Sequence, residues 1–189
     1  MKAHLFKLLA LFLLLSGAAQ ARDGFESVRC GSDVSRALAG RRMSDESVVK
    51  IESRHIALGL KDLGGDEISD RFNSTSWLIC GKEYMLLSDA RGIVHDVLAF
   101  PPHSRTSPEF AGETCRAKGK QVAGPIVAVL VNRSAGSGGN SRHFSPQDGI
   151  LLPAKAAWKI EENAAKFVAL SSTGLSCPRS GIITADGGP

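Results

Sequence analysis

Apolar residues between positions 32 and 59 recur three or four residues apart, the spacing of one face of an α-helix. A short helix is predicted after Ser32, which can cap its N-terminus, and Gly40 is expected to end it. A second helix is predicted after Ser44, ending at Gly59. Its apolar stripe consists of Val48, Ile51, His55 and Leu58.

Further along the chain, β-branched and aromatic residues predict strands. Residues 77–87 and 93–100 are predicted to form a hairpin around the glycine-containing segment 88–92. Both faces of the second strand are largely apolar, which indicates a central position in its sheet. The continuous apolar run within 121–131 predicts a buried strand, and residues 156–170 predict a second hairpin.

The intervening segments are polar or rich in glycine. Residues 60–76 contain a Gly-Gly pair and are expected to be a connecting loop, as are residues 103–115. A flexible surface loop is predicted at 132–149, and the tail beyond Cys177 is expected to fray. The predicted fold class is α+β, with short N-terminal helices packed on a mainly antiparallel sheet of hairpins and stabilised by disulfides.

Residues 1–21 have the three-part pattern of a secretory signal peptide, with cleavage expected after Ala21. The apolar run from Leu8 to Leu15 is far shorter than the roughly 20 residues that span a bilayer. Residues 22–189 are expected to form a single small domain, secreted or periplasmic, with no membrane span.

All four cysteines lie after the predicted leader, and an even number in an exported protein indicates two disulfides. Four cysteines allow three pairings, which sequence alone does not separate. The pairing favoured here is Cys80 with Cys115 and Cys30 with Cys177, since the first would staple the middle of the fold and the second would join its ends. No metal site is predicted, because no two cysteines have zinc-ligand spacing.

Charge changes this picture only locally. Removal of Lys2 and Lys7 with the leader leaves 21 basic and 19 acidic side chains, too even a balance for a nucleic-acid-binding domain. Residues 105–142 nevertheless carry six bases against two acids. We expect this to be either a solvated surface or a patch for an acidic partner or anionic envelope component. The candidate contact residues are Arg116, Lys118, Lys120, Arg133 and Arg142.

Catalytic signals are weak. His95 and Asp96 are adjacent, but neighbours in a strand point to opposite faces and cannot cooperate directly. His103 precedes Ser104, yet the chain has neither a G-x-S-x-G elbow nor a phosphate-binding G-x-x-x-x-G-K-[ST] loop. No catalytic set and no cofactor are therefore predicted.

Two functions remain open. The first is an exported, disulfide-bonded protein that binds, inhibits or assists a protein or envelope partner, and the absence of a convergent polar set favours it over an enzyme. The alternative is a small exported hydrolase whose site is assembled near His95, His103 and Ser104.

Overall fold

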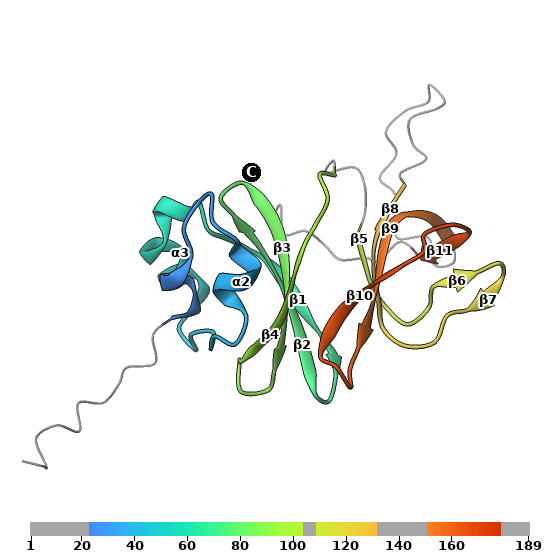
Figure 1. Cartoon of the computed structure of the whole chain (residues 1–189), viewed down its shortest axis with the longest axis horizontal. Coiled ribbons are helices and arrows are strands. Elements are labelled where there is room, and N and C mark those ends of the chain that lie inside the picture. Colours follow the sequence, from blue (N-terminus) through green and yellow to red (C-terminus); the bar gives the residue numbers. More distant parts are fainter. Residues whose placement is uncertain (1–22, 104–108, 132–150, 179–189) are drawn as a thin grey trace, which may run out of the picture.

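Short helical segments precede the strands in the computed structural model of the chain, which describes residues 23–103, 109–131 and 151–178 (Figure 1). Both predicted helices are present, although each is capped one to three residues later than expected. The side chain of Asp33 accepts from the Arg36 backbone N–H and caps the first helix, and Ser47 begins the second. The second α-helix ends at Arg54, earlier than predicted, and the left-handed Gly59 instead ends the 3-10 turn that follows it. The segments are η1 (Gly24–Ser27), α2 (Val34–Leu38), α3 (Val48–Arg54) and η2 (Ile56–Leu58).

The first sheet is an antiparallel meander in the order β1-β2-β3-β4. The predicted hairpin is confirmed for β3 and β4, but the run 77–87 is not one strand. A two-residue turn at Cys80 and Gly81 divides it, and both residues have positive φ, the conformation of a tight hairpin turn whose twist matches its strands. The strands are β1 (Lys61–Ser69), β2 (Phe72–Ile79), β3 (Lys82–Asp89) and β4 (Val94–Ala99).

The prediction of a connecting loop over 60–76 was wrong, because this segment contains β1 and the start of β2. Gly64 has φ +99° and follows a bulge at Leu63, where the register of β1 shifts, and both glycines pair with β2 rather than forming a turn. β1 is a largely exposed strand at the end of its sheet, which explains its polar sequence.

The predicted central position of residues 93–100 was also wrong, since β4 is the last strand of its sheet. Its apolar residues are explained by packing on both faces. Val94 and Val97 belong to one hydrophobic cluster, whereas Leu98 and Phe100 belong to another. A bulge opposite Leu87 and Ser88 breaks the simple alternation that the sequence suggested.

The second sheet has the order β5-β8-β9-β11-β6-β7, and β10 also pairs with β9. The predicted buried strand is confirmed by β8, all five residues of which are buried. The second predicted hairpin is confirmed by β9 and β10. The region 103–115 is not wholly loop, because β5 lies within it. The strands are β5 (Glu109–Gly112), β6 (Arg116–Ala117), β7 (Lys120–Gln121), β8 (Ile126–Leu130), β9 (Leu151–Glu161), β10 (Lys166–Leu170) and β11 (Leu175–Pro178).

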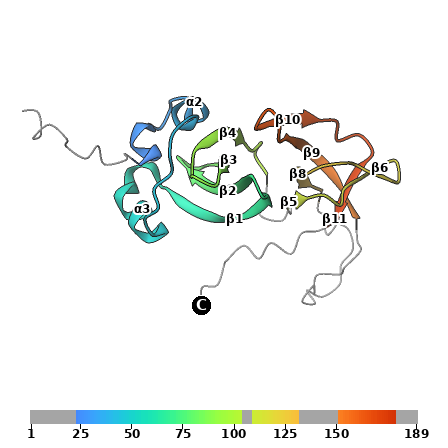
Figure 2. The ribbon, with the colours of Figure 1, turned by 90° about the horizontal axis from the view of Figure 1, so that it is seen from below.

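Three hydrophobic clusters connect these elements. One joins Phe25 and Leu38 of the helical region to Trp77 and Leu86 of the first sheet. A second lies where the two sheets meet and combines Phe72, Leu87 and Phe100 with Val127, Val129 and Ile160 (Figure 2). The third lies within the second sheet, around its disulfide. The fold is therefore mainly β, and α+β only in the broad sense.

Polar contacts also join the sheets. Asp96 Oδ2 accepts a hydrogen bond of 2.8 Å from the Phe167 backbone N–H, and Ser69 Oγ lies 3.2 Å from Glu162 Oε2. None of the helices in the described part of the chain is long and apolar enough to cross a membrane. The predicted leader, the predicted flexible loop at 132–149 and nearly all of the tail after Cys177 lie outside the described residues.

Candidate functional site

Two disulfides are present, and their pairing differs from the one favoured from the sequence. Cys30 is bonded to Cys80, and Cys115 is bonded to Cys177. The expected bridges Cys80–Cys115 and Cys30–Cys177 were wrong. They assumed one bridge across the middle of the fold and a second bridge between the two ends of the chain. Instead each bridge closes within one sheet and its neighbouring elements. The two bridges are compatible with an exported protein.

Beside the second bridge, the β6–β7 hairpin carries three of the predicted contact residues. Ala117 pairs with Lys120, so Lys118 and Gly119 form a two-residue turn, and both have positive φ. The Lys118 backbone N–H donates to Gly174 O, and Val122 N–H donates to Cys115 O. β6 pairs with β11, which contains Cys177, so the disulfide fixes the base of the hairpin.

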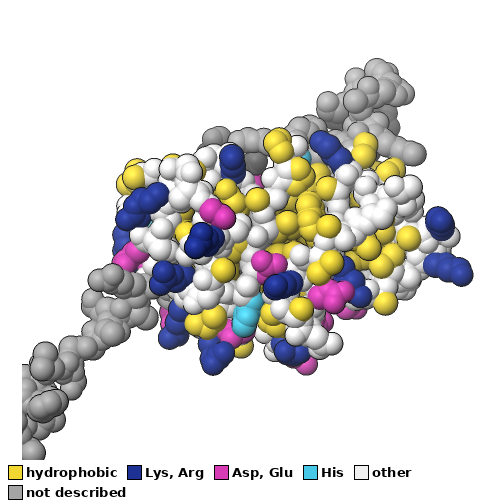
Figure 3. Space-filling model, viewed as in Figure 1, with side chains coloured by type: hydrophobic (Ala, Val, Ile, Leu, Met, Phe, Trp, Pro, Cys, Tyr) yellow, Lys and Arg dark blue, Asp and Glu magenta, His cyan; other side chains and the backbone are white. Residues whose placement is uncertain are grey.

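The cationic side chains of this hairpin face solvent. Arg116, Lys118 and Lys120 are all exposed, and within the described ranges none of them forms an ion pair. Basic side chains project at this end of the molecule, opposite the helices (Figure 3). Arg133 and Arg142 lie outside the described residues, so their relation to the hairpin stays a prediction.

The histidine-aspartate pair of β4 is divided between two separate interactions. His95 Nε2 lies 3.3 Å from Asp89 Oδ2, and the ring packs edge-on against Phe72. Asp96 accepts the inter-sheet bond from Phe167 N–H described above, and its other oxygen accepts from the Val97 N–H. Asp96 therefore has a structural partner on each oxygen.

His103 lies at the end of the segment that follows β4. Its Nδ1 lies 3.0 Å from Pro101 O and its Nε2 lies 3.4 Å from Glu83 Oε2, while its ring packs against Phe100. Ser104 lies outside the described residues. Each of the two histidines thus pairs with its own carboxylate, and the residues that the structure describes contain no group of three metal-ligating side chains.

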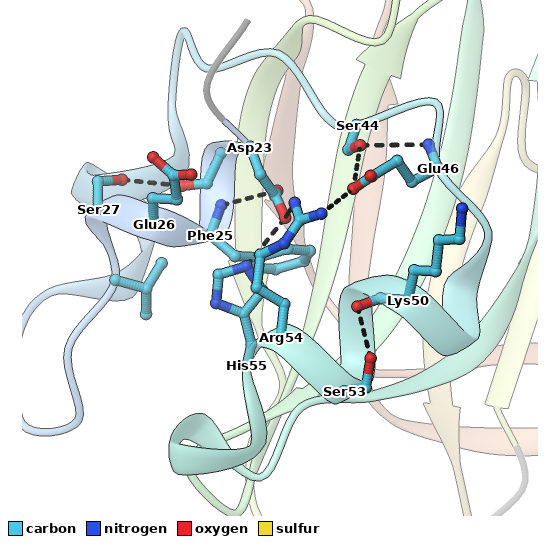
Figure 4. A network of polar contacts seen from close by, with 12 residues as sticks. Asp23, Phe25, Glu26, Ser27, Ser44, Glu46, Lys50, Ser53, Arg54 and His55 are labelled. Carbon is cyan, nitrogen blue, oxygen red and sulfur yellow. Dashed lines mark hydrogen bonds and ion pairs between the residues drawn. The ribbon is translucent and has the colours of Figure 1, made fainter. Parts of the chain in front are cut away.

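Sequence reasoning missed a polar cluster at the helical end of the molecule (Figure 4). His55 Nε2 lies 2.9 Å from Asp23 Oδ2, and Asp23 Oδ1 accepts from the Phe25 backbone N–H. The Asp23 side chain is 1% exposed and that of His55 is 10% exposed. A buried carboxylate of this kind orients the imidazole and fixes its tautomer, as in ligand-binding and catalytic histidines.

Arg54 extends this cluster to the surface. Its guanidinium lies 3.8 Å from Asp23 Oδ2 and also forms an ion pair with Glu46. The sequence contained one signal for the cluster, namely a histidine in the buried stripe of a predicted helix. Asp23 gave none, because its contact with His55 joins residues 32 positions apart.

No family model, no curated protein and no solved structure matches this chain.

Proposed function

We propose that this is an exported, disulfide-braced binding or accessory protein that contacts an anionic partner, a protein or an envelope component, through the β6–β7 hairpin. The observation that carries the proposal is the set of three exposed, unpaired cations on a short hairpin with a disulfide at its base. Arg133 and Arg142, which lie outside the described residues, remain predicted contact residues.

Rigidity supports this role. Two-residue turns with positive φ at both positions leave little freedom in the hairpin, and the bridge to β11 limits its movement relative to the sheet. A contact surface that is already ordered loses little conformational entropy when a partner binds. The hairpin therefore has the properties of a preformed recognition element.

Electrostatics support it as well. Exposed cations without a local counter-ion attract acidic surfaces over about a Debye length, roughly 8 Å at physiological ionic strength. Near an anionic membrane surface each Lys or Arg contributes about 1 kcal/mol. Binding through this hairpin should therefore weaken as salt is added.

The test replaces Lys118 and Lys120 with Gln and measures retention by an envelope extract and by vesicles containing anionic lipid. We expect the double variant to bind about thirtyfold more weakly at low salt, from about 1 kcal/mol for each lysine. The matched control, Lys61→Gln with Lys82→Gln, removes the same charge from exposed positions on the first sheet. Equal losses in both variants, or no retention of the unaltered protein, would contradict the proposal.

A further inference from the structure

A cavity of about 660 Å³ opens beside the Asp23–His55 pair. It lies between η1 and the residues after it on one side, and the end of α3 with η2 on the other. This is the end of the molecule opposite the β6–β7 hairpin (Figure 1). Its volume falls in the range of roughly 300–1,000 Å³ that is typical of small-molecule sites.

Three arginines line this cavity and two of them are not paired with an acid. Arg54 is engaged by Glu46 and Asp23. Arg29 uses one guanidinium nitrogen for two backbone carbonyls, and Arg41 has no side-chain partner in the described part of the chain.

The acids of the cavity compensate this charge incompletely. The Asp23 carboxylate is buried and bonded through both oxygens, so it has no oxygen left for a ligand. The exposed Glu26 is the other carboxylate among the lining residues. The lining residues therefore include two guanidinium groups without an acidic partner and one unpaired acid. Guanidinium pairs well with carboxylate because it can donate two parallel hydrogen bonds.

His55 supplies a hydrogen-bonding group in the same cavity. Its Nε2 faces the Asp23 carboxylate, which only accepts, so Nε2 carries a proton and Nδ1 is the ring nitrogen left for a ligand (Figure 4). Among the described residues, Trp77 Nε1 is the one buried side-chain nitrogen or oxygen atom without a hydrogen-bond partner. His55 Nδ1 also has no partner in this part of the chain, so it is not a buried atom. Solvent or a ligand can therefore reach it.

We propose that this cavity binds a small hydroxycarboxylate. The ligand carboxylate would pair with Arg41 and Arg29, and its hydroxyl group would form a hydrogen bond with His55 Nδ1. An organic acid, unlike a lone inorganic anion, can also contact the apolar side chains of Leu58 and Ala57 in this cavity. This cavity and the β6–β7 hairpin share no residue, so binding at one site does not require the other.

The ligand test compares lactate with propionate, which differ by one hydroxyl group. Titration of the purified protein is followed by the ¹⁵N chemical shift of His55 Nδ1 and by calorimetry. We expect lactate to bind about fivefold more tightly, as one hydrogen bond of about 1 kcal/mol predicts, and to shift the Nδ1 signal. Equal affinities, no shift of Nδ1, or no saturable binding of lactate would overturn the proposal.

The protein variants test the sign of the charge effect. Arg41→Gln should weaken lactate binding at least fivefold, and Glu26→Gln should strengthen it. Arg42→Gln is the matched control, because Arg42 is also exposed but pairs with Asp45 and does not line the cavity. Equal effects of Arg41→Gln and Arg42→Gln, or weaker binding by Glu26→Gln, would contradict the proposal.

Discussion

Asp89 shows how local hydrogen bonds control a single ionisable group. It lies at the end of β3, where burial opposes ionisation of its carboxyl. Hydrogen bonds from the Ile93 backbone N–H, from Arg91 and from His95 outweigh that effect and lower its pKa from 3.8 to about 2. The carboxylate thereby holds the β3–β4 turn in the shape that β4 requires.

This lowered pKa predicts a change of stability in acid. Because the pKa in the folded state is below that in the unfolded state, the stabilisation is complete above about pH 4 and is lost as the pH falls through 2. Asp89→Asn should therefore be less stable than the unaltered protein at pH 6, and the difference should shrink as the pH falls below 4 and disappear below about pH 2. Urea unfolding at several pH values measures it, and a difference that does not change with pH would contradict the assignment.

Residue-scale prediction from the sequence succeeded where local spacing decides the environment. Of the predicted stripe, His55, Ile51 and Leu58 are buried, whereas Val48 is exposed. The partner of a buried polar group, in contrast, is set by the tertiary fold. Neither Asp23 beside His55 nor Phe167 N–H beside Asp96 leaves a signature in the local sequence.

At the scale of elements, β1 depends on a glycine at the point where two strands approach closely. A Cβ atom added at Gly65 would lie 2.2 Å from Ser74 O and 3.0 Å from Thr75 Cα, both of them backbone atoms of β2. Because backbone cannot yield as a flexible side chain can, only glycine fits this position.

Gly65→Ala should accordingly lower the free energy of unfolding by about 2 kcal/mol or more, through displacement of β1 from β2. Hydrogen exchange of the β1 amides should accelerate in the same variant. The control is Asp66→Ala in the same strand, where the exposed side chain makes no hydrogen bond and the change should stay within about 0.5 kcal/mol. Equal destabilisation by both substitutions would show that the close approach has no special role.

The presence or absence of an apolar side-chain pattern explains which elements could be predicted from the sequence. β3, β4, β8 and the β9–β10 hairpin were recognised because buried side chains give their sequences an apolar pattern. The strands β1, β5, β6, β7 and β11 were missed, because they are short or polar and their sequences give little apolar pattern.

At the scale of the whole molecule, β1–β4 form one sheet and the later strands β5–β11 form the other. The part of the chain that contains each sheet has its own disulfide. The cluster around Phe100 and Ile160 joins the two parts without a covalent bond beyond the chain itself. Removing one bridge should therefore affect mainly the elements of its own part.

Replacing Cys30 and Cys80 with Ala should lower the free energy of unfolding by about 2–4 kcal/mol and leave binding through the β6–β7 hairpin unchanged. Replacing Cys115 and Cys177 should lower the free energy of unfolding by a similar amount. It should also weaken that binding, because the base of the hairpin is then no longer held by the bridge. Urea unfolding and vesicle binding measure both effects. Peptide mapping without reduction should recover the two native cross-linked pairs, and any other pairing would contradict this arrangement.

Each bridge joins cysteines that are consecutive along the polypeptide, the first with the second and the third with the fourth. Synthesis delivers cysteines in that same order. An oxidant that couples thiols as they emerge would therefore produce the correct partners at once, and the protein should reach its native state without a catalyst that reshuffles mispaired bonds.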